Sequence, residues 1–381
     1  MDFALSEESR AIFEMAQAFG QEEIAPHARA WEAAGTIPRA LWAKVAALGL
    51  GGLYVSEEHG GSALSRLDAT LVFEALAMAC PSVSAFLSIH NMCGGMIEKF
   101  GTPDLKDRFL PKLCTMETVF SYCLTEPGSG SDAAALRTRA EAVPEGWKLN
   151  GTKAFISGGG YSDAYITMVR TGAPGPKGIS TVIVEAGTPG LSFGAKEDKM
   201  GWRAQPTAQV QFDDCIIPAK NLVGAPGRGF SYAMAGLDGG RLNIAASALG
   251  GAQAAMNATL AYMGERKAFG QPLDQFQALQ FRLAEMEVKL QSARIFLRQA
   301  AWKLDQAAPD ATKFCAMAKL YVTDAAFDVA NQCLQLHGGY GYLADYGIEK
   351  ILRDLRVHQI LEGTNEIMRL IIGRAVLAER N

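Results

Sequence analysis

A carboxylate near the end of the chain, Glu362, could act as a general base. The amphipathic run 357–361 leads into it, and Gly363 and Thr364 follow it. From Asn365 onward apolar side chains recur at helical spacing, so Thr364 is expected to cap a terminal helix. Two interpretations of Glu362 are open. It is either an acidic group stabilised by the dipole of that helix, or a general base in a closed pocket, where desolvation raises its pKa.

Two segments rich in glycine and hydroxyl groups could hydrogen-bond the polar edge of a ring or a phosphate. Tyr122–Asp132 offers two glycines and three serine or threonine hydroxyls, and its backbone N–H groups need no charged partner. Phe155–Gly160 places an aromatic ring and a hydroxyl at an expected strand end, before a flexible turn. Each segment also has a plainer interpretation, because the first could be a linker and Phe155 could belong to the core.

Arg266 lies at the expected end of a helix that is rich in small residues. A cation there is favourable on dipole grounds alone, and a planar guanidinium also suits a diphosphate, so both interpretations stay open. The run Gly339–Ala344 matches the GxGxxA dinucleotide pattern, but it follows a helical run and lies in no βαβ unit, so we reject a nicotinamide site. No HExxH, spaced Cys/His cluster or GxSxG motif supports a metal site or a serine hydrolase.

Composition narrows the class of protein. The chain has 381 residues, 49% of them hydrophobic, which allows two or three domains. Its net charge is -4 and its basic residues are scattered, so we expect no nucleic-acid partner. The seven cysteines lie in apolar contexts without a CxxC pair and are expected to be reduced, buried thiols. Without a targeting segment or an apolar run of roughly 18 residues, we expect no membrane span and a cytoplasmic protein, or the mature form of a mitochondrial-matrix one.

Hydrophobic periodicity divides the chain into three segments. Residues 1–120 and 230–381 are predicted to be helical, whereas residues 121–229 carry short alternating runs typical of strands. Because these strands follow one another without helices between them, an antiparallel barrel or sandwich is expected. Asn150-Gly151, between two of the runs, predicts a hairpin turn. The long helices of the last segment are enough for a four-helix bundle.

Taken together, these motifs resemble the acyl-CoA dehydrogenase family over essentially the whole chain. Tyr122–Asp132 and Gln335–Gly341 are similar to that family's two signature regions, and their spacing to Glu362-Gly363-Thr364 is also typical of it. The resemblance implies a mainly α fold with a β insert: an N-terminal helical domain (1–120), a middle antiparallel β domain (121–229) and a C-terminal four-helix bundle (230–381). It also implies FAD between the last two domains, a homotetramer, and an electron-transferring flavoprotein as electron acceptor.

The resemblance assigns roles to three groups of positions. Glu362 matches the catalytic base. The positions matching the family's FAD contacts, some of them expected across a subunit interface, are Tyr122, Leu124, Thr125, Gly130, Ser131, Phe155, Ile156, Ser157, Arg266, Phe276, Gln277, Gln335, Leu336, His337, Gly338, Gly339, Thr364, Asn365 and Glu366. The positions matching its acyl-CoA contacts are Ser131, Asp238, Gly239, Gly240, Arg241, Gly363 and Arg374.

Four runs look particularly like family members that act on isobutyryl-CoA: 88–93, 237–245, 337–343 and 357–363. The implied reaction is α,β-dehydrogenation of isobutyryl-CoA to methacrylyl-CoA, a step of valine breakdown, with 2-methylbutyryl-CoA or butyryl-CoA as alternative substrates. In members acting on isovaleryl and long-chain substrates the base comes from the position that is Gly240 here, which leaves Glu362 as the candidate. The competing classes are an acyl-CoA oxidase and a non-catalytic protein that binds flavin or CoA.

Overall fold

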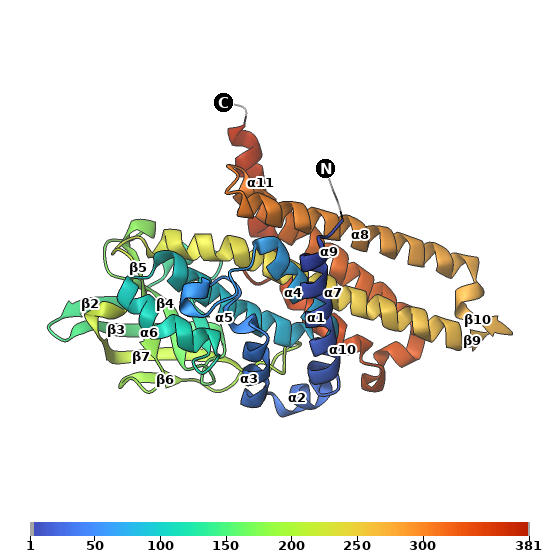
Figure 1. The fold of residues 1–381 in the computed structure, drawn as a ribbon, viewed down its shortest axis with the longest axis horizontal. Coiled ribbons are helices and arrows are strands. Elements are labelled where there is room, and N and C mark those ends of the chain that lie inside the picture. Colours follow the sequence, from blue (N-terminus) through green and yellow to red (C-terminus); the bar gives the residue numbers. More distant parts are fainter. Residues whose placement is uncertain (1–3, 380–381) are drawn as a thin grey trace.

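Helices form both ends of the chain and strands form its middle in the computed structural model, which describes residues 4–379 (Figure 1). Ser6 caps the first helix, as its side chain accepts the backbone N–H of Ser9 at 3.0 Å. Pro26 lies between a π-helical turn (Gly20–Ile24) and the second helix. The N-terminal helices are α1 (Glu7–Phe19), α2 (Ala28–Ala34), α3 (Arg39–Ala47), α4 (Arg66–Ala79), α5 (Pro81–Phe100) and α6 (Pro103–Cys114).

The middle of the chain forms one sheet with the order β6-β7-β3-β2-β4-β5-β8, and β1 pairs with β4. Most neighbours are antiparallel, as predicted, but β4 runs parallel to both β1 and β2. The strands are β1 (Phe120–Cys123), β2 (Arg139–Val143), β3 (Gly146–Ser157), β4 (Ala164–Arg170), β5 (Ile179–Glu185), β6 (Leu191–Phe193), β7 (Thr207–Ile217) and β8 (Leu222–Val223).

The hairpin predicted at Asn150-Gly151 is wrong. Both residues lie inside β3, at a bulge where the register against β7 shifts. The Asn150 side chain accepts the backbone N–H of Asp214 at 2.9 Å, and Gly151 has φ +145° and packs on Thr138, where a Cβ would come within 2.7 Å of the neighbouring Cα. Asn150-Gly151 therefore forms a β-bulge instead of a turn. The turn between β2 and β3 lies at Pro144 and Glu145.

Long helices return after the sheet: α7 (Gly229–Glu265), α8 (Gln277–Asp305), α9 (Ala311–Leu336), α10 (Ile348–Arg356) and α11 (Asn365–Ala378). A two-stranded ribbon of β9 (Lys267–Ala268) and β10 (Gln271–Pro272) interrupts the helices between α7 and α8. The small residues of α7 let its neighbours approach closely, since a Cβ on Gly250 would lie 2.0 Å from the carbonyl oxygen of Glu74 in α4. Figure 1 shows α7 running from the sheet to the β9–β10 ribbon at the opposite end of the molecule.

Two expectations from composition can be compared with this fold. All seven cysteines are buried and free, as predicted. Over residues 4–379, no helix is both long and apolar enough to cross a membrane.

Candidate active site

Glu362 lies between the 3-10 turn Val357–Gln359 and α11. Its φ is +54° and that of Gly363 is +88°, so two consecutive residues adopt the left-handed conformation. For a residue with a side chain this costs about 1 kcal/mol or more and persists only where the surroundings hold it. Thr364 caps α11, as predicted, by accepting the N–H of Ile367 at 3.3 Å. This turn fixes the direction in which the Glu362 side chain leaves the backbone.

The carboxylate of Glu362 faces α7 at Gly240. A Cβ placed on Gly240 would lie 2.3 Å from Glu362 Oε2, so the carboxylate occupies the space that any side chain there would need. Oε2 is shielded from solvent and has no hydrogen-bond partner among the described residues. Burial raises the pKa of Glu362 to about 7, although the positive charges of Arg241 and Lys319 oppose the shift. The structure thus places Glu362 in the environment expected of a base near neutral pH.

Arg241, one residue further along α7, is buried beside this carboxylate. Its Nη1 donates to Asp238 Oδ1 at 2.6 Å, and its Nε donates to the backbone oxygen of Glu362 at 3.5 Å. The predicted substrate positions Asp238, Gly240 and Arg241 are therefore grouped around the base. Gly239 faces another way, as a Cβ there would lie 2.4 Å from Arg66 Nη1.

Tyr122, at the end of β1, supplies a second buried polar atom. Its hydroxyl is shielded from solvent and has no hydrogen-bond partner within residues 4–379. Burial raises the pKa of Tyr122 well above its usual value, and the negative charge of Glu362 adds to the shift. Two polar groups from distant parts of the chain, Tyr122 and Glu362, thus lie close enough to interact electrostatically without hydrogen-bonding each other. Such atoms are the ones that a bound ligand would be expected to meet.

The loop after Tyr122 is pinned to β3 by a buried ion pair. Lys153, fully buried in β3, donates from Nζ to Glu126 Oε1 at 2.8 Å and to the backbone oxygen of Leu124 at 3.1 Å. The Glu126 carboxylate also accepts the backbone N–H groups of Arg137 and Thr138. Sequence reasoning named the loop but gave no role to Lys153, because nothing in its immediate neighbourhood marks it as the partner of Glu126.

Phe155 and Ser157 end the same strand. Phe155 has φ +58° and its side chain is 69% exposed, so it is not the core residue that one interpretation allowed. Ile156, between them, is buried in the sheet, and at the tip of the pinned loop Gly130 and Ser131 are exposed. An exposed aromatic ring, a polar loop and two unpartnered buried oxygens together suit a flat polar ring such as a flavin.

A second group of predicted FAD residues lies at the far end of α7. Arg266 follows α7 and lies 5.3 Å from the Tyr340 ring centroid, and Tyr262 stacks on His337 with ring centroids 4.4 Å apart. Phe276, at the start of α8, contacts Phe269 edge-on, and Phe269 is 97% exposed. This end therefore gathers Arg266, Phe276, Gln277 and the run Gln335–Gly339.

One chain does not bring the two groups together. Arg241 and Arg266 are both tied to α7, and the residues between them span roughly 37 Å at 1.5 Å per residue. Figure 1 shows the β9–β10 ribbon at the opposite end of α7 from the sheet. A cofactor that contacted both groups would have to meet the second group in another copy of the chain.

The positions after Glu362 have different environments. Gly363 and Asn365 are tied to α9 through Lys319, whereas Glu366 is exposed on the first turn of α11. Arg374 is exposed about 12 Å further along the same helix, so this chain alone does not bring it to Glu362. The described residues also contain no group of His, Cys, Asp or Glu that could hold a metal ion.

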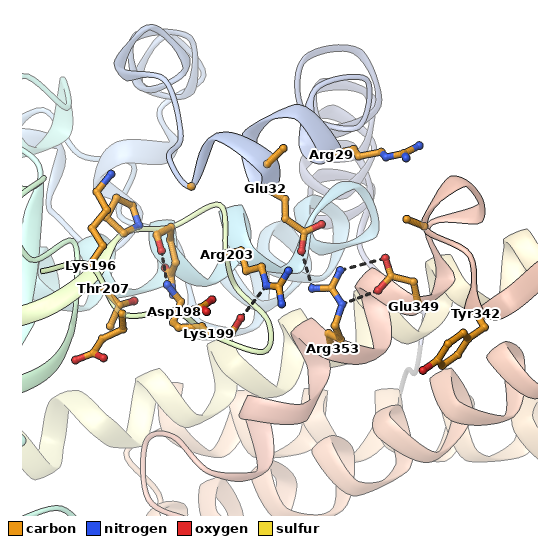
Figure 2. A pocket seen from close by; sticks show the side chains of 16 residues that line it. Arg29, Glu32, Lys196, Asp198, Lys199, Arg203, Thr207, Tyr342, Glu349 and Arg353 are labelled. Atoms are coloured by element: carbon orange, nitrogen blue, oxygen red, sulfur yellow. Dashed lines mark hydrogen bonds and ion pairs between the residues drawn. The ribbon is translucent and has the colours of Figure 1, made fainter.

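Figure 2 shows a charged hollow that sequence reasoning did not single out. It has a volume of about 630 Å³ and lies between α2, the segment 196–207 and α10. Arg353 is paired there with Glu32 and Glu349, at 2.6 and 2.5 Å. Lys199 donates to the backbone oxygen of Gln205, and burial lowers its pKa to about 8. Its cations and anions are nearly balanced, and most of the pairs hold the surrounding elements together.

A smaller hollow of about 230 Å³ lies beside α7, one turn before Gly240. Met92 and Met96 from α5 line it together with Gly236, where a Cβ would lie 2.9 Å from the Met96 sulfur. Residues four apart share a helix face. Met96 therefore packs closely on the α7 face that carries Gly240, one turn before that glycine.

Three family models match the chain. They are described as the N-terminal, middle and C-terminal domains of acyl-CoA dehydrogenase, and they match residues 6–117, 121–215 and 227–377. The models thus match nearly all of the chain.

Similar proteins cover the chain almost completely. Mitochondrial isobutyryl-CoA dehydrogenase of Bos taurus is 52% identical over 375 residues, which are 98% of this chain and 90% of that protein. The solved structure of butyryl-CoA dehydrogenase from Megasphaera elsdenii has a TM-score of 0.96 at 37% identity and covers 99% of this chain and 100% of its own. A chain in the structure described as the electron transferring flavoprotein of Acidaminococcus fermentans has a TM-score of 0.96 at 38% identity, with the same coverage.

Proposed function

The chain belongs to the acyl-CoA dehydrogenase family, an FAD-dependent family, and from this premise we propose that it oxidises isobutyryl-CoA to methacrylyl-CoA. The similarity to isobutyryl-CoA dehydrogenase at 52% identity supports this substrate. Met96 supports a short acyl chain, because it packs closely on α7 at Gly236, one turn before Gly240. 2-Methylbutyryl-CoA and butyryl-CoA remain the alternatives, since one methylene changes discrimination by only about 1–3 kcal/mol.

In the proposed reaction Glu362 removes the α-proton of the thioester. A carboxylate in water is a weak base, and burial strengthens it while excluding competing water. The left-handed turn and Gly240 let the carboxylate reach the space beside α7. Bound FAD would supply the acceptor for the β-hydride. Glu362 and the residues that border the flavin would hold the acyl chain in place for both transfers, and such positioning accounts for much of the rate.

Several residues of this chain would hold the flavin. Tyr122, the pinned loop as far as Ser131, and Phe155–Ser157 would border the ring. The group around Arg266 would bind the diphosphate and adenosine of an FAD that is mainly held by a partner chain. The separation along α7 supports this division, because the two groups lie too far apart to share one cofactor within one chain.

A homotetramer is part of the proposal, and the surface of α8 supports self-association. Four large apolar residues on α8 are 53–65% exposed and recur at seven-residue spacing, so they share one helix face. They are Phe281, Val288, Ile295 and Trp302. An apolar stripe of this kind marks an interaction surface.

The proposed electron acceptor is an electron-transferring flavoprotein, as the family suggests. An oxidase is the competing enzyme, and release of peroxide on mixing the protein with substrate in air would favour it. Relatives from mitochondria and from bacteria are both similar to this chain, and a cytoplasmic or mitochondrial-matrix location stays a prediction.

The observation that carries the proposal is the solvent-shielded, unpartnered Oε2 of Glu362 opposite Gly240. The test is an anaerobic visible titration of the FAD-loaded protein with isobutyryl-, 2-methylbutyryl-, butyryl- and isovaleryl-CoA in turn. We expect isobutyryl-CoA to bleach the flavin band best, and Glu362→Gln to keep FAD but lose bleaching. Glu145→Gln, at an exposed turn, is the matched control and should behave as the wild type. A Glu362→Gln protein that is bleached at the normal rate would refute the assignment of the base.

A further inference from the structure

Lys319 is a buried lysine of α9 with no carboxylate within ion-pair distance among the described residues. Its Nζ donates to the backbone oxygen of Gly363 at 2.8 Å and to Asn365 Oδ1 at 2.8 Å. Burying an ammonium group is costly unless it is hydrogen-bonded and compensated. Both of its partners lie on the connection between the 3-10 turn Val357–Gln359 and α11, which carries Glu362. Their hydrogen bonds offset part of the free-energy cost of burying the ammonium group.

Two cations hold two consecutive carbonyl groups of this connection. Arg241 of α7 donates to the carbonyl of Glu362, and Lys319 of α9 donates to the carbonyl of Gly363. These are the two residues with φ of +54° and +88°. A left-handed conformation at Glu362 needs such support, because an unrestrained chain would leave it.

Asn365 extends the same support into α9. Its Nδ2 donates to Asp324 Oδ1 at 2.7 Å and to Thr323 Oγ1 at 3.1 Å, while its Oδ1 accepts from Lys319. Asp324 also accepts from Gln359 Nε2 at 2.7 Å, on the other side of Glu362. The connection is therefore fastened to one turn of α9 at both of its ends.

Charged and titratable groups from every adjoining element surround Glu362. Arg241 and its partner Asp238 come from α7, Tyr122 from β1, and His358 from the 3-10 turn before Glu362, while Asp324 of α9 and Glu366 of α11 interact electrostatically with Lys319. Burial lowers the pKa of Lys319 to about 8, and the charge of Glu362 opposes that shift. Burial also lowers the pKa of His358 to about 3, so His358 is neutral and leaves Arg241 and Lys319 as the cations beside the base.

We propose that Lys319 is a positioning residue, which holds the left-handed turn at Glu362–Gly363 and keeps the carboxylate ionised at working pH. This inference rests on the proposal that Glu362 is the base. Lys319 acts through the backbone and its charge, since its hydrogen bonds go to Gly363 and Asn365 instead of to the carboxylate.

The test compares pH profiles of flavin reduction by isobutyryl-CoA for wild type, Lys319→Met and Lys319→Gln. Removing a cation destabilises the ionised carboxylate and raises its pKa. The pH at which the rate of flavin reduction rises should therefore increase by about one unit in both variants. Starting from a pKa of about 7, this lowers the rate at pH 7 about fivefold. Gln can still donate to the Gly363 carbonyl, so the plateau rate at high pH should fall less in Lys319→Gln than in Lys319→Met.

Lys289→Met is the matched control, because it removes a half-exposed lysine of α8 that pairs with Asp328 of α9. It should leave the profile unchanged. If the rate of flavin reduction rises at the same pH in the FAD-loaded Lys319 variants as in the wild type, the inference is overturned. Failure of both variants to fold would also overturn it, because Lys319 would then support the whole fold instead of the turn. Glu362→Gln distinguishes failure of the proposed function from failure of this inference. If Glu362→Gln is active, the proposed base is wrong. If it is inactive while the Lys319 variants behave as wild type, only the role proposed for Lys319 is wrong.

Discussion

Replacing Gly240 with alanine tests the active-site geometry with one methyl group. The new Cβ would lie 2.3 Å from Glu362 Oε2, 2.9 Å from its Cδ and 3.0 Å from Oε1. Ordinary contact needs about 3.4 Å or more, so the carboxylate has to move by roughly 1 Å. A displacement of that size at a reacting group can cost about 100-fold in rate.

The same substitution should not weaken the fold. Gly240 lies inside α7, where alanine is favoured over glycine by about 1 kcal/mol, so the loss of rate should appear in a protein that melts no lower than wild type. Gly264→Ala is the control on the same helix. A Cβ there meets nothing closer than Asp274 Oδ2 at 3.7 Å, so this variant should gain helix stability without losing rate.

The assay is anaerobic flavin reduction by isobutyryl-CoA, with the thermal melting point and flavin content measured on the same samples. We expect Gly240→Ala to retain FAD and to be reduced about 100-fold more slowly, while Gly264→Ala is reduced normally. Reduction of Gly240→Ala within threefold of the wild-type rate would refute the reasoning, because Glu362 could then not occupy that space during the reaction.

Two other predictions concern the flavin loop and the surface of α8. Lys153→Met leaves the Glu126 carboxylate buried without its cation, so we expect FAD to bind at least tenfold more weakly. The measurement is the recovery of flavin fluorescence on dilution. An unchanged affinity for FAD would show that the ion pair does not position the loop. Ile295→Glu places a charge in the exposed apolar stripe of α8, so we expect light scattering to report a smaller assembly. The control Glu145→Gln should keep the wild-type mass. An unchanged mass for Ile295→Glu would exclude the stripe as an interface.

Periodicity was sufficient to predict the order of helices, strands and helices, because each long helix carries its own apolar face. It was wrong at Asn150-Gly151, where the local signal for a turn is the same as the signal for a bulge with positive φ. It missed β1, a short strand that pairs in parallel with β4 across more than 40 residues. A short stretch of sequence does not show pairing between strands that lie so far apart in the chain.

The local sequence left two interpretations of Glu362 open, and the fold explains why. The raised pKa of Glu362 arises from burial against α7, and Gly240 is 122 positions away in the sequence. Thr364 could be identified as a cap because capping is local. Lys319 had no local signal, since an apolar run of α9 surrounds it and its partners lie on another segment.

The length of α7 makes this helix the part of the chain least tolerant of insertions and deletions. Adding one residue between Arg241 and Arg266 would rotate everything beyond it by about 100° and shift it by about 1.5 Å. The two ends of α7 serve different regions, so no compensating change at one end could restore the other. The connection between β4 and β5 carries no such constraint, because the exposed turn at 172–177 can absorb a change of length. Attempts to shorten, split or circularly permute this protein should therefore cut at that connection and leave α7 intact.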